Sequence, residues 1–325
     1  MNFIATLLQN KNHEPIKPQG EAFAATNIAL IKYWGKRDTL LNLPLTNSLS
    51  MSVPGKGSHT VLKPTTGHSD RIFLDNQALS TEASFAKRIT AFLDLFRTPQ
   101  QKFDIHTHNN IPTAAGLASS ASGFAALTLA LDDLYDWQFD KKTLSLFARL
   151  GSGSACRSVY DGFVEWQKGE RDDGLDSIAI PLDAHWPELK IGLLILSTDE
   201  KPISSRIAMQ RTVETSRYYQ HWPEIVEKDL ALLKTALLNK DFVLLGETAE
   251  HNAIAMHQTM HDAHPAIDYD LPETRAIKEK IKILRKQGLP VYFTQDAGPN
   301  VKLLFLEEHT KNIEKQFPLI NVARK

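Results

Sequence analysis

The stretch NNIPTAAGLASSASG, Asn109 to Gly123, opens with polar residues and a proline and continues almost entirely with Gly, Ala, Ser and Thr. Before it, KFDIHTHNN (102–110) alternates like a β-strand, and after it GFAALTLALDDLY (123–135) has helical spacing. The serines therefore fall near a helix N-terminus, where free N–H groups and the helix dipole attract anions. Because small side chains let the backbone approach a ligand, we predict a phosphate-binding strand–loop–helix unit.

This stretch is not a Walker phosphate-binding loop, since no lysine follows its second glycine. PGKGSH at Pro54 also fails, because Ser50 stands where the first glycine of that motif is required. A tightly packed helix start without a ligand is the alternative. Ligand binding is favoured by the proline–threonine turn, by the paired serines Ser119 and Ser120, and by a second glycine–serine loop.

That second loop, GSGSACR (151–157), places Ser152, Ser154 and Arg157 together. Backbone amides, hydroxyls and a guanidinium are the groups that a diphosphate, a triphosphate or a carboxylate requires. A flexible turn with a solvated arginine is the alternative.

Two strand-like segments end in charged residues. In NIALIKYWGKRD (27–38), strand alternation puts Lys32 on the face opposite Asn27, so its ammonium either reaches solvent or points at an anion in a cleft. In FTQDAGPN (293–300), Asp296 precedes a glycine–proline turn, a position where aspartate is common for local reasons. The spacing alone does not decide either case.

Composition limits the function classes. The 325 residues contain 42% hydrophobic and 23% charged residues, as in ordinary globular proteins. With 37 basic against 38 acidic residues, the net charge of −1 argues against a nucleic-acid or membrane-surface partner. Cys156 is the one cysteine, which excludes an internal disulfide and a cysteine-based metal cluster. No apolar run approaches a membrane span, and no signal peptide is visible, so we expect a cytoplasmic protein.

The pattern of elements predicts an α+β protein in two halves, each with a sheet covered by helices. We expect a flexible N-terminal extension over 1–20, a first domain over 21–186 and a second over 187–325, with the boundary in DAHWPE (183–188). Helices are expected at 81–96 (capped by Ser80 or Thr81), 123–135, 141–151, 204–219, 223–238, 241–260 and 272–288. Strands are expected in the second half of 21–36 and at 48–53, 70–75, 102–110 and 190–198, with two more around the Gly-Pro turn in 290–308.

Six segments together resemble the diphosphomevalonate decarboxylase family of the GHMP kinase superfamily: NIALIKYWGKRD, NLPLTNSLSMS, DRIFLD, PTAAGLASSASG, GSGSACRSVYDGFVEW and FTQDAGPN. The resemblance runs in order from about Phe23 to the C-terminus. GLASSA marks only the superfamily, whereas KYWGKRD and GSGSACRS are specific to the family. The resemblance implies a two-domain GHMP fold and a homodimer. It also implies that ATP and Mg²⁺ are used to convert 5-diphosphomevalonate to isopentenyl diphosphate, with release of ADP, phosphate and carbon dioxide.

The resemblance also implies residue roles. Asp296 accepts the proton of the tertiary hydroxyl, Lys32 lies beside the reacting groups, and Arg157, held by Asn27, clamps the substrate carboxylate. Ser205 lies near the transferred phosphoryl group. The remaining substrate-binding positions are Tyr33, Trp34, Gly35, Lys36, Arg71, Ser152, Gly153, Ser154, Ala155, Cys156 and Arg206. The ATP-binding positions are Pro112, Ala114, Gly116, Leu117, Ala118, Ser119, Ser120 and Ser122, and magnesium is held mainly through the ATP phosphates rather than by direct protein ligands.

Two other functions stay open. A GHMP kinase would phosphorylate a mevalonate-type hydroxyl without decarboxylation, but the joint presence of Asp296, Lys32 and Arg157 counts against it. A catalytically inactive ATP sensor would not need that set.

His257 and His261 are spaced as in a zinc-protease helix, but Gln258 stands where that motif requires glutamate, so we expect helix-surface histidines instead.

Overall fold

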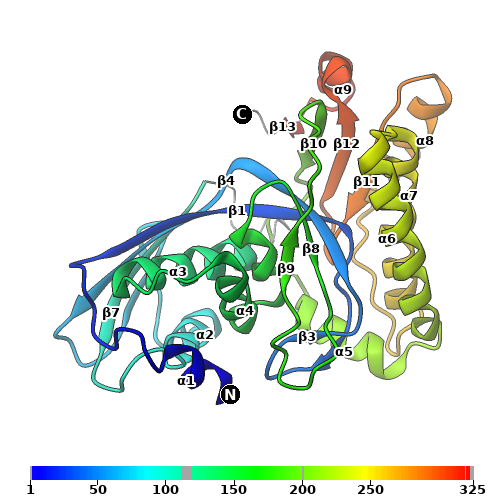
Figure 1. Ribbon diagram of the computed structural model, residues 1–325. Coiled ribbons are helices and arrows are strands. Elements are labelled where there is room, and N and C mark those ends of the chain that lie inside the picture. Colours follow the sequence, from blue (N-terminus) through cyan, green and yellow to red (C-terminus); the bar gives the residue numbers. More distant parts are fainter. Residues whose placement is uncertain (1, 111–118, 200, 319, 323–325) are drawn as a thin grey trace.

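The computed structural model describes residues 2–110, 119–199, 201–318 and 320–322. It has two halves, each with a sheet covered by helices, which confirms the predicted α+β class (Figure 1). The predicted boundary near residue 186 falls between the last strand of one sheet, β9 (Ala179–Pro181), and the first strand of the other, β10 (Leu189–Leu194).

The N-terminal half is built on a seven-stranded sheet with the order β6-β5-β7-β4-β8-β9, in which β1 pairs with β4. Its other strands are β1 (Gly20–Ile31), β4 (Ser48–Thr65), β5 (Arg71–Leu74), β6 (Gln77–Ala78), β7 (Lys102–Asn109) and β8 (Phe163–Trp166). A small separate pair is formed by β2 (Lys36–Asp38) and β3 (Leu43–Pro44). Strand β4 is long enough to pair with β7 at one end and with β8 at the other.

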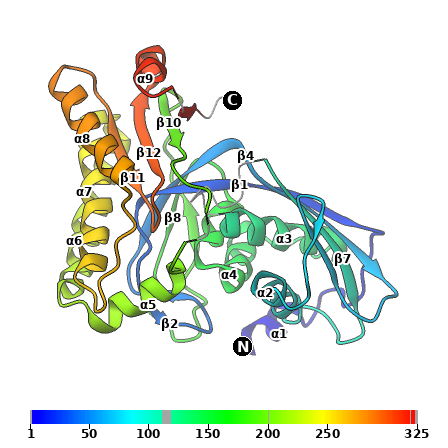
Figure 2. The ribbon, with the colours of Figure 1, turned by 180° about the vertical axis from the view of Figure 1, so that it is seen from behind.

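Helices cover one face of this sheet, as Figure 2 shows from behind. They are α2 (Ser84–Leu93), α3 (Ser119–Tyr135), α4 (Lys141–Gly151) and the 3₁₀ helix η1 (Gly153–Val159). Their apolar side chains form one buried cluster with the strands, which includes Phe103, Phe124 and Phe147. Helix α3 and the 3₁₀ helix η1 carry serines of the two glycine–serine segments. The sheet and this helical layer therefore hold both segments against a common core.

The C-terminal half has a four-stranded sheet with the order β11-β12-β10-β13. The strands other than β10 are β11 (Tyr292–Gln295), β12 (Val301–Leu306) and β13 (Ile320–Val322). The helical elements are α5 (Ser205–Thr215), η2 (Tyr218–His221), α6 (Trp222–Asn239), α7 (Phe242–His261), α8 (Pro272–Lys286), η3 (Glu307–His309) and α9 (Thr310–Gln316).

The two halves share a hydrophobic core. Ile28, Leu30 and Ile31, at the C-terminal end of β1, lie in the same buried cluster as Trp222 of α6 and Met256 of α7. A continuous apolar contact of this kind resists sliding, because separating the halves would expose these side chains to water. The end of β1 is therefore fixed against α6 and α7.

The N-terminal extension is packed, and the expectation that it is flexible is wrong. Residues Asn2–Leu8 form helix α1, whose side chains Phe3, Ile4 and Leu8 are buried in the core of the N-terminal half. Asn12 then donates to the carbonyl of Tyr135, the last residue of α3, at 2.8 Å, and its own carbonyl accepts from Nε1 of Trp137 at 2.7 Å. The apolar residues of the extension are few and lie before two prolines, so no local pattern in the sequence indicates that they are buried.

Two local predictions are corrected in the same half. Helix α2 begins at Ser84, and the residue before it, Ala83, makes no side-chain cap. Ser80 instead accepts a hydrogen bond from the backbone of Glu82, which makes a local turn ahead of the helix. The loop at 151–157 is not irregular, because its residues from Gly153 onward form the 3₁₀ helix η1.

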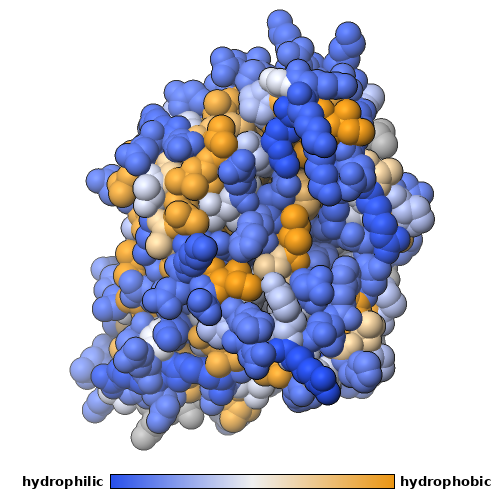
Figure 3. Space-filling view, turned by 90° about the vertical axis from the view of Figure 1, so that its right-hand side faces the viewer, coloured by the Kyte–Doolittle hydropathy of each residue, from blue (hydrophilic) through white to orange (hydrophobic). Residues whose placement is uncertain are grey.

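The face that carries α6, α7 and α8 mixes hydrophilic surface with separate apolar areas (Figure 3). Large apolar side chains exposed on these helices are Leu232, Leu238, Val243, Ile254 and Ile283. Within the ranges that the structure describes, no helix combines the length and the apolar composition that a membrane span needs.

Because Ile4 is 3% exposed in the core, we expect Ile4→Ala to lower the free energy of unfolding by about 2–4 kcal/mol, through lost apolar contact and the cavity left behind. Urea denaturation measures this change. Gln9→Ala, on the exposed end of the same segment, is the control and should shift stability by less than about 0.5 kcal/mol. Equal stability of Ile4→Ala and the wild type would show that the extension does not pack.

Candidate active site

A cavity of about 640 Å³ lies between the two halves. Of the described residues that line it, six carry positive charge and Asp296 is the one carboxylate. The cations are Lys32, Lys36, Arg88, Arg157, Lys201 and Arg206. A cavity with this excess of positive charge is suited to a ligand that carries several negative charges.

Asp296 lies between two buried ammonium groups. Its Oδ1 atom is 2.8 Å from Nζ of Lys32, and its Oδ2 atom is 2.9 Å from Nζ of Lys302. Burial alone would raise the pKa of Asp296, but the two lysines hold it far below its ordinary value. Asp296 is therefore an anion whose two oxygens have fixed positions.

The two lysines differ in origin. Lys32 follows β1 and is 2% exposed, and its ammonium also donates to the Ala29 carbonyl at 2.7 Å. Burial lowers the pKa of Lys32 to about 8, although the charge of Asp296 opposes this shift. Lys302 comes from β12, on the face of that strand occupied by Leu304, which packs in the core shared by the two halves.

Simple alternation would place Lys32 on the face opposite Asn27, yet both residues line the cavity. The reason is an irregularity in the pairing of β1 with β4 between Ala29 and Ile31, which shifts the register by one residue. A β-bulge of this kind redirects the following side chains. Lys32 therefore points at Asp296 and not into solvent.

Arg157 is buried in η1, and its guanidinium donates only to neutral oxygens. Nε donates to the hydroxyl of Ser50 at 3.0 Å, Nη1 to the hydroxyl of Ser48, and Nη2 to Oδ1 of Asn27 at 3.3 Å. Asn27 is itself oriented by donating to the Ser158 hydroxyl at 2.7 Å. Among the described residues no carboxylate pairs with Arg157, so this buried charge lacks an anionic partner.

A second group of cations, Lys36, Arg88 and Arg206, gathers in the same cavity. Burial, together with the nearby charges of Arg206 and Arg88, lowers the pKa of Lys36 to about 8. Arg88 extends from α2 and is held by donating to the Gly151 carbonyl at 3.1 Å. The hydroxyls of Ser152 and Ser120, 3.4 Å apart, join the two serine-containing segments beside these cations.

Aromatic residues form part of the cavity wall. Tyr33 and Trp34 line the cavity, and the Trp34 carbonyl accepts a hydrogen bond from the hydroxyl of Tyr219 at 2.8 Å. Gly35 has φ of +106°, and an added Cβ would lie 1.8 Å from that hydroxyl, so only glycine fits there. A Cβ on Gly153 would likewise approach the Tyr33 ring to 2.9 Å.

Ser205 lies in the first turn of α5, at the edge of the cavity. Its hydroxyl accepts a hydrogen bond from Nζ of Lys201 at 3.2 Å, and the same ammonium donates to the Ala297 carbonyl. Lys201 therefore connects the start of α5 to the loop that follows Asp296.

Several predicted residues are not brought to the cavity. Arg71 lies on β5 with its side chain 64% exposed, where it pairs with Asp104 of the neighbouring strand β7, and it is not among the described residues that line the cavity. Ser122 is buried and bonded to the Ser58 hydroxyl at 2.7 Å. Ala155 and Cys156 pack behind the loop, and burial raises the pKa of the Cys156 thiol to about 12.

The first part of the predicted ATP-binding stretch cannot be compared with the structure. Pro112, Ala114, Gly116, Leu117 and Ala118 lie outside the described residues, and the side chain of Ser119 is not described.

Sequence reasoning missed Arg88, Lys201 and Lys302. Arg88 and Lys201 lie in segments without a recognised motif. Lys302 interrupts the apolar run VKLLFL of β12, and a charged residue within an otherwise buried strand is a signal that could have drawn attention to it. In the described part of the chain, no three His, Cys, Asp or Glu side chains gather closely enough to hold a metal ion.

Comparisons with known proteins match both halves of the chain. The model of the diphosphomevalonate decarboxylase-like N-terminal domain matches residues 24–179, and that of the mevalonate 5-diphosphate decarboxylase C-terminal domain matches residues 191–321. A Candida albicans protein named diphosphomevalonate decarboxylase is 37% identical over 308 residues, which cover 89% of this chain and 85% of the relative.

Two solved structures are similar along nearly the whole chain. Mevalonate diphosphate decarboxylase from Staphylococcus aureus has a TM-score of 0.88 at 37% identity, with 94% of this chain and 95% of that chain covered. A protein named MDDEF, solved in complex with MVAPP, AMPPCP and magnesium, has a TM-score of 0.87 at 38% identity, with 94% and 96% covered. The chain therefore belongs to the diphosphomevalonate decarboxylase family and has its two-domain GHMP fold.

Proposed function

We propose that this enzyme catalyses the ATP-dependent decarboxylation of 5-diphosphomevalonate to isopentenyl diphosphate, with release of ADP, phosphate and carbon dioxide. The observation that carries the proposal is the carboxylate of Asp296, which is held between Lys32 and Lys302 in a cavity whose other charged lining residues, among those described, are all cations. A substrate with a diphosphate and a carboxylate would supply the missing negative charge.

The lining residues fit the phosphates of both substrates. When bound, ATP and Mg²⁺ supply the phosphoryl group that turns a tertiary hydroxyl into a leaving group and the charge that stabilises its transfer. Ser120, near the N-terminus of α3, would hold ATP phosphates, and Ser205 would lie near the transferred group. Lys36, Arg88 and Arg206, with the hydroxyls of Ser152 and Ser154, would bind the substrate diphosphate.

Asp296 would accept the proton of the tertiary hydroxyl as that oxygen is phosphorylated. Its low pKa makes it a weak base, but phosphoryl transfer passes through a loose transition state in which the proton leaves late. The position of the acceptor then matters more than its basicity. Lys32, whose ammonium already touches Asp296, would stabilise negative charge on the transferred group.

Arg157 would bind the substrate carboxylate through two parallel hydrogen bonds. Asn27, Ser48 and Ser50 already fix the plane of its guanidinium, so the carboxylate would be held in one orientation. As phosphate leaves the tertiary carbon, the electrons of the bond to the carboxylate carbon form the new double bond, and carbon dioxide departs.

A single assay separates this proposal from a kinase without decarboxylation. The protein is mixed with MgATP and 5-diphosphomevalonate, and ADP, phosphate and carbon dioxide are measured together. Equal amounts of the three products are expected for the decarboxylase. ADP without carbon dioxide would instead identify the kinase, and no product above background would identify an ATP-binding sensor.

We also propose that the chain acts as a homodimer in the cytoplasm. The exposed apolar side chains on α6, α7 and α8, among them Leu238 and Val243, support a contact between copies. Sedimentation velocity at micromolar concentration would distinguish a dimer from a monomer.

Asp296→Asn keeps the size of the side chain but removes the proton acceptor. We expect turnover to fall by about 10²–10⁴, the usual contribution of a positioned acid or base, with little change in the Michaelis constants. ADP and carbon dioxide should decrease together, because phosphorylation precedes decarboxylation. Normal ADP formation without carbon dioxide would show that Asp296 acts in the second step and would contradict the assignment.

Arg88 and Arg71 form a matched pair of arginines from the same domain. If Arg88 binds the diphosphate, Arg88→Gln should raise the Michaelis constant for 5-diphosphomevalonate by about tenfold or more, because a charge-assisted hydrogen bond contributes about 1.5–3 kcal/mol. Arg71→Gln should leave it unchanged, since Arg71 pairs with Asp104 on the surface. The reverse pattern in steady-state kinetics would restore the role that sequence resemblance assigns to Arg71.

A further inference from the structure

The loop 296–299 is held by side chains that donate hydrogen bonds to its four successive backbone carbonyl groups. The Asp296 carbonyl is 3.2 Å from Nε2 of His257, and the Ala297 carbonyl accepts from Lys201. The carbonyls of Gly298 and Pro299 accept from Nε2 of Gln295 at 2.8 Å and from Oγ1 of Thr274 at 2.9 Å. These donors come from α7, β11, α8 and the segment before α5.

This arrangement determines where the carboxylate of Asp296 lies. Asp296 follows the last residue of β11, so the strand pairing ends immediately before it. Its backbone beyond that point is fixed by hydrogen bonds from other elements. A displacement of about 1 Å at a reacting group can cost about a hundredfold in rate, so the donors to this loop are candidates for positioning the reaction.

His257 is suited to act as a donor and not as a charged group. It is 5% exposed on α7, which corrects the expectation of a surface histidine for this residue but not for the exposed His261. Burial, with the nearby charge of Lys278, lowers the pKa of His257 to about 3. The ring is therefore neutral at pH 7. Because a carbonyl oxygen only accepts, and because Nδ1 has no hydrogen-bond partner among the described residues, the proton belongs on Nε2, where it is donated to the Asp296 carbonyl.

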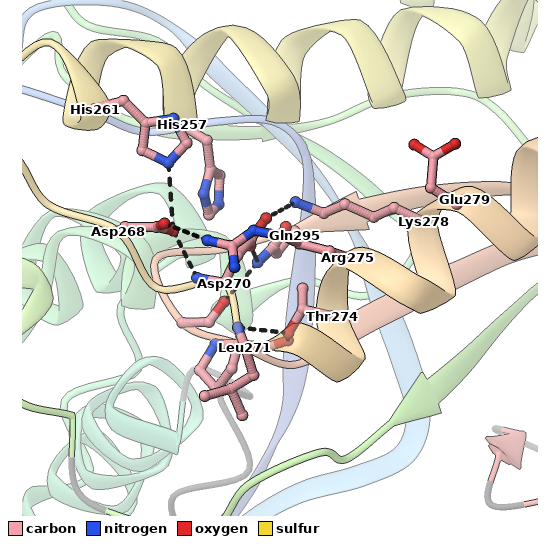
Figure 4. Close-up of polar contacts among 12 residues, drawn as sticks. His257, His261, Asp268, Asp270, Leu271, Thr274, Arg275, Lys278, Glu279 and Gln295 are labelled. Carbon is pink, nitrogen blue, oxygen red and sulfur yellow. Dashed lines mark hydrogen bonds and ion pairs between the residues drawn. The ribbon is translucent and has the colours of Figure 1, made fainter.

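Gln295 is oriented by a buried ion pair behind it, visible in Figure 4. Its Nε2 donates one hydrogen to Oδ1 of Asp270 at 2.8 Å and the other to the Gly298 carbonyl. Oδ2 of Asp270 pairs with Nζ of Lys278 of α8 at 2.7 Å, and both side chains are largely buried. If the Gln295 amide were flipped, its oxygen would face the Asp270 carboxylate and the Gly298 carbonyl, which both accept hydrogen bonds and cannot donate. Asp270 therefore keeps the amide nitrogen of Gln295 directed at the Gly298 carbonyl.

A second cluster of charged and polar side chains, His261, Asp268 and Arg275, lies beside the Asp270–Lys278 ion pair at the surface. In Figure 4 the ring of His261, one helical turn from His257, faces Asp268, which also pairs with Arg275. His261 and Asp268 are 41% and 43% exposed, and among the described residues neither side chain forms a hydrogen bond with the 296–299 loop. His261 therefore offers a matched control on the same helix.

We propose that His257 and Gln295 are positioning residues for Asp296, acting through hydrogen bonds to the backbone of the loop that carries it. The proposal rests on the assignment of Asp296 as proton acceptor. Neither residue is among the described residues that line the cavity. His257 sets the Asp296 peptide directly, and Gln295, oriented by Asp270 and Lys278, closes the turn at Gly298.

The test compares His257→Met, which removes the donor, with His257→Gln, whose amide nitrogen can replace Nε2. We expect kcat for ADP and carbon dioxide formation to fall by about ten- to a hundredfold in His257→Met, with both Michaelis constants within about twofold. His257→Gln should recover most of the rate. His261→Met and His261→Gln should both match the wild type.

Gln295→Met gives an independent variant of nearly equal size. It should lower kcat without raising either Michaelis constant, and thermal melting checks that each variant is folded. Normal kcat in folded His257→Met or Gln295→Met, or equal losses in His257→Met and His257→Gln, would overturn the proposal. A wild type that makes no carbon dioxide would instead contradict the proposed function, so the two failures are distinguishable.

Discussion

A single carboxylate held between two buried ammonium groups organises this site. Lys32 follows the first strand of the N-terminal half, whereas Asp296 and Lys302 belong to the C-terminal half. Removing one member of a buried ion pair leaves an uncompensated charge and typically costs about 3–5 kcal/mol. The Lys32–Asp296 contact therefore forms only when the halves are docked as they are, with the apolar end of β1 packed against α6 and α7. Electrostatics and packing specify the same arrangement.

This arrangement leaves positive charge uncompensated. Asp296 is shared by two lysines, and Arg157 is surrounded by hydroxyl and amide oxygens. Buried cations without anionic partners are costly in the free protein, so binding a polyanion gains part of that energy back. On the proposed function, the same excess would favour anionic ligands, and the substrate carboxylate and diphosphate would be bound by separate cations. The proposed function of this protein rests on these separate groups of cations.

The sequence predicts regular elements and motif residues better than it predicts long-range contacts. Alternation and helical spacing locate the strands and helices of both sheets, and resemblance brings Asp296 and Arg157 to one cavity. Alternation alone misplaces Lys32, because a single register shift in β1 reverses its face. Arg88 and Lys302 depend on how α2 and β12 are docked, which no local pattern encodes. Burial of α1 and of His257 is likewise a tertiary property, since a few apolar residues or a lone histidine have the same local appearance on a surface.

The central claim is that Asp296 remains ionised between its two lysines. Infrared difference spectra of the wild type and the Asp296→Asn variant isolate the carboxyl vibrations of this residue as pH is varied, with circular dichroism confirming that the protein stays folded. An ordinary aspartate is half protonated near pH 3.9. Because Lys302 and Lys32 depress the pKa of Asp296, we predict that the carboxylate bands persist undiminished at about pH 4. A protonated carboxyl band that grows with a midpoint near or above that pH would contradict the account.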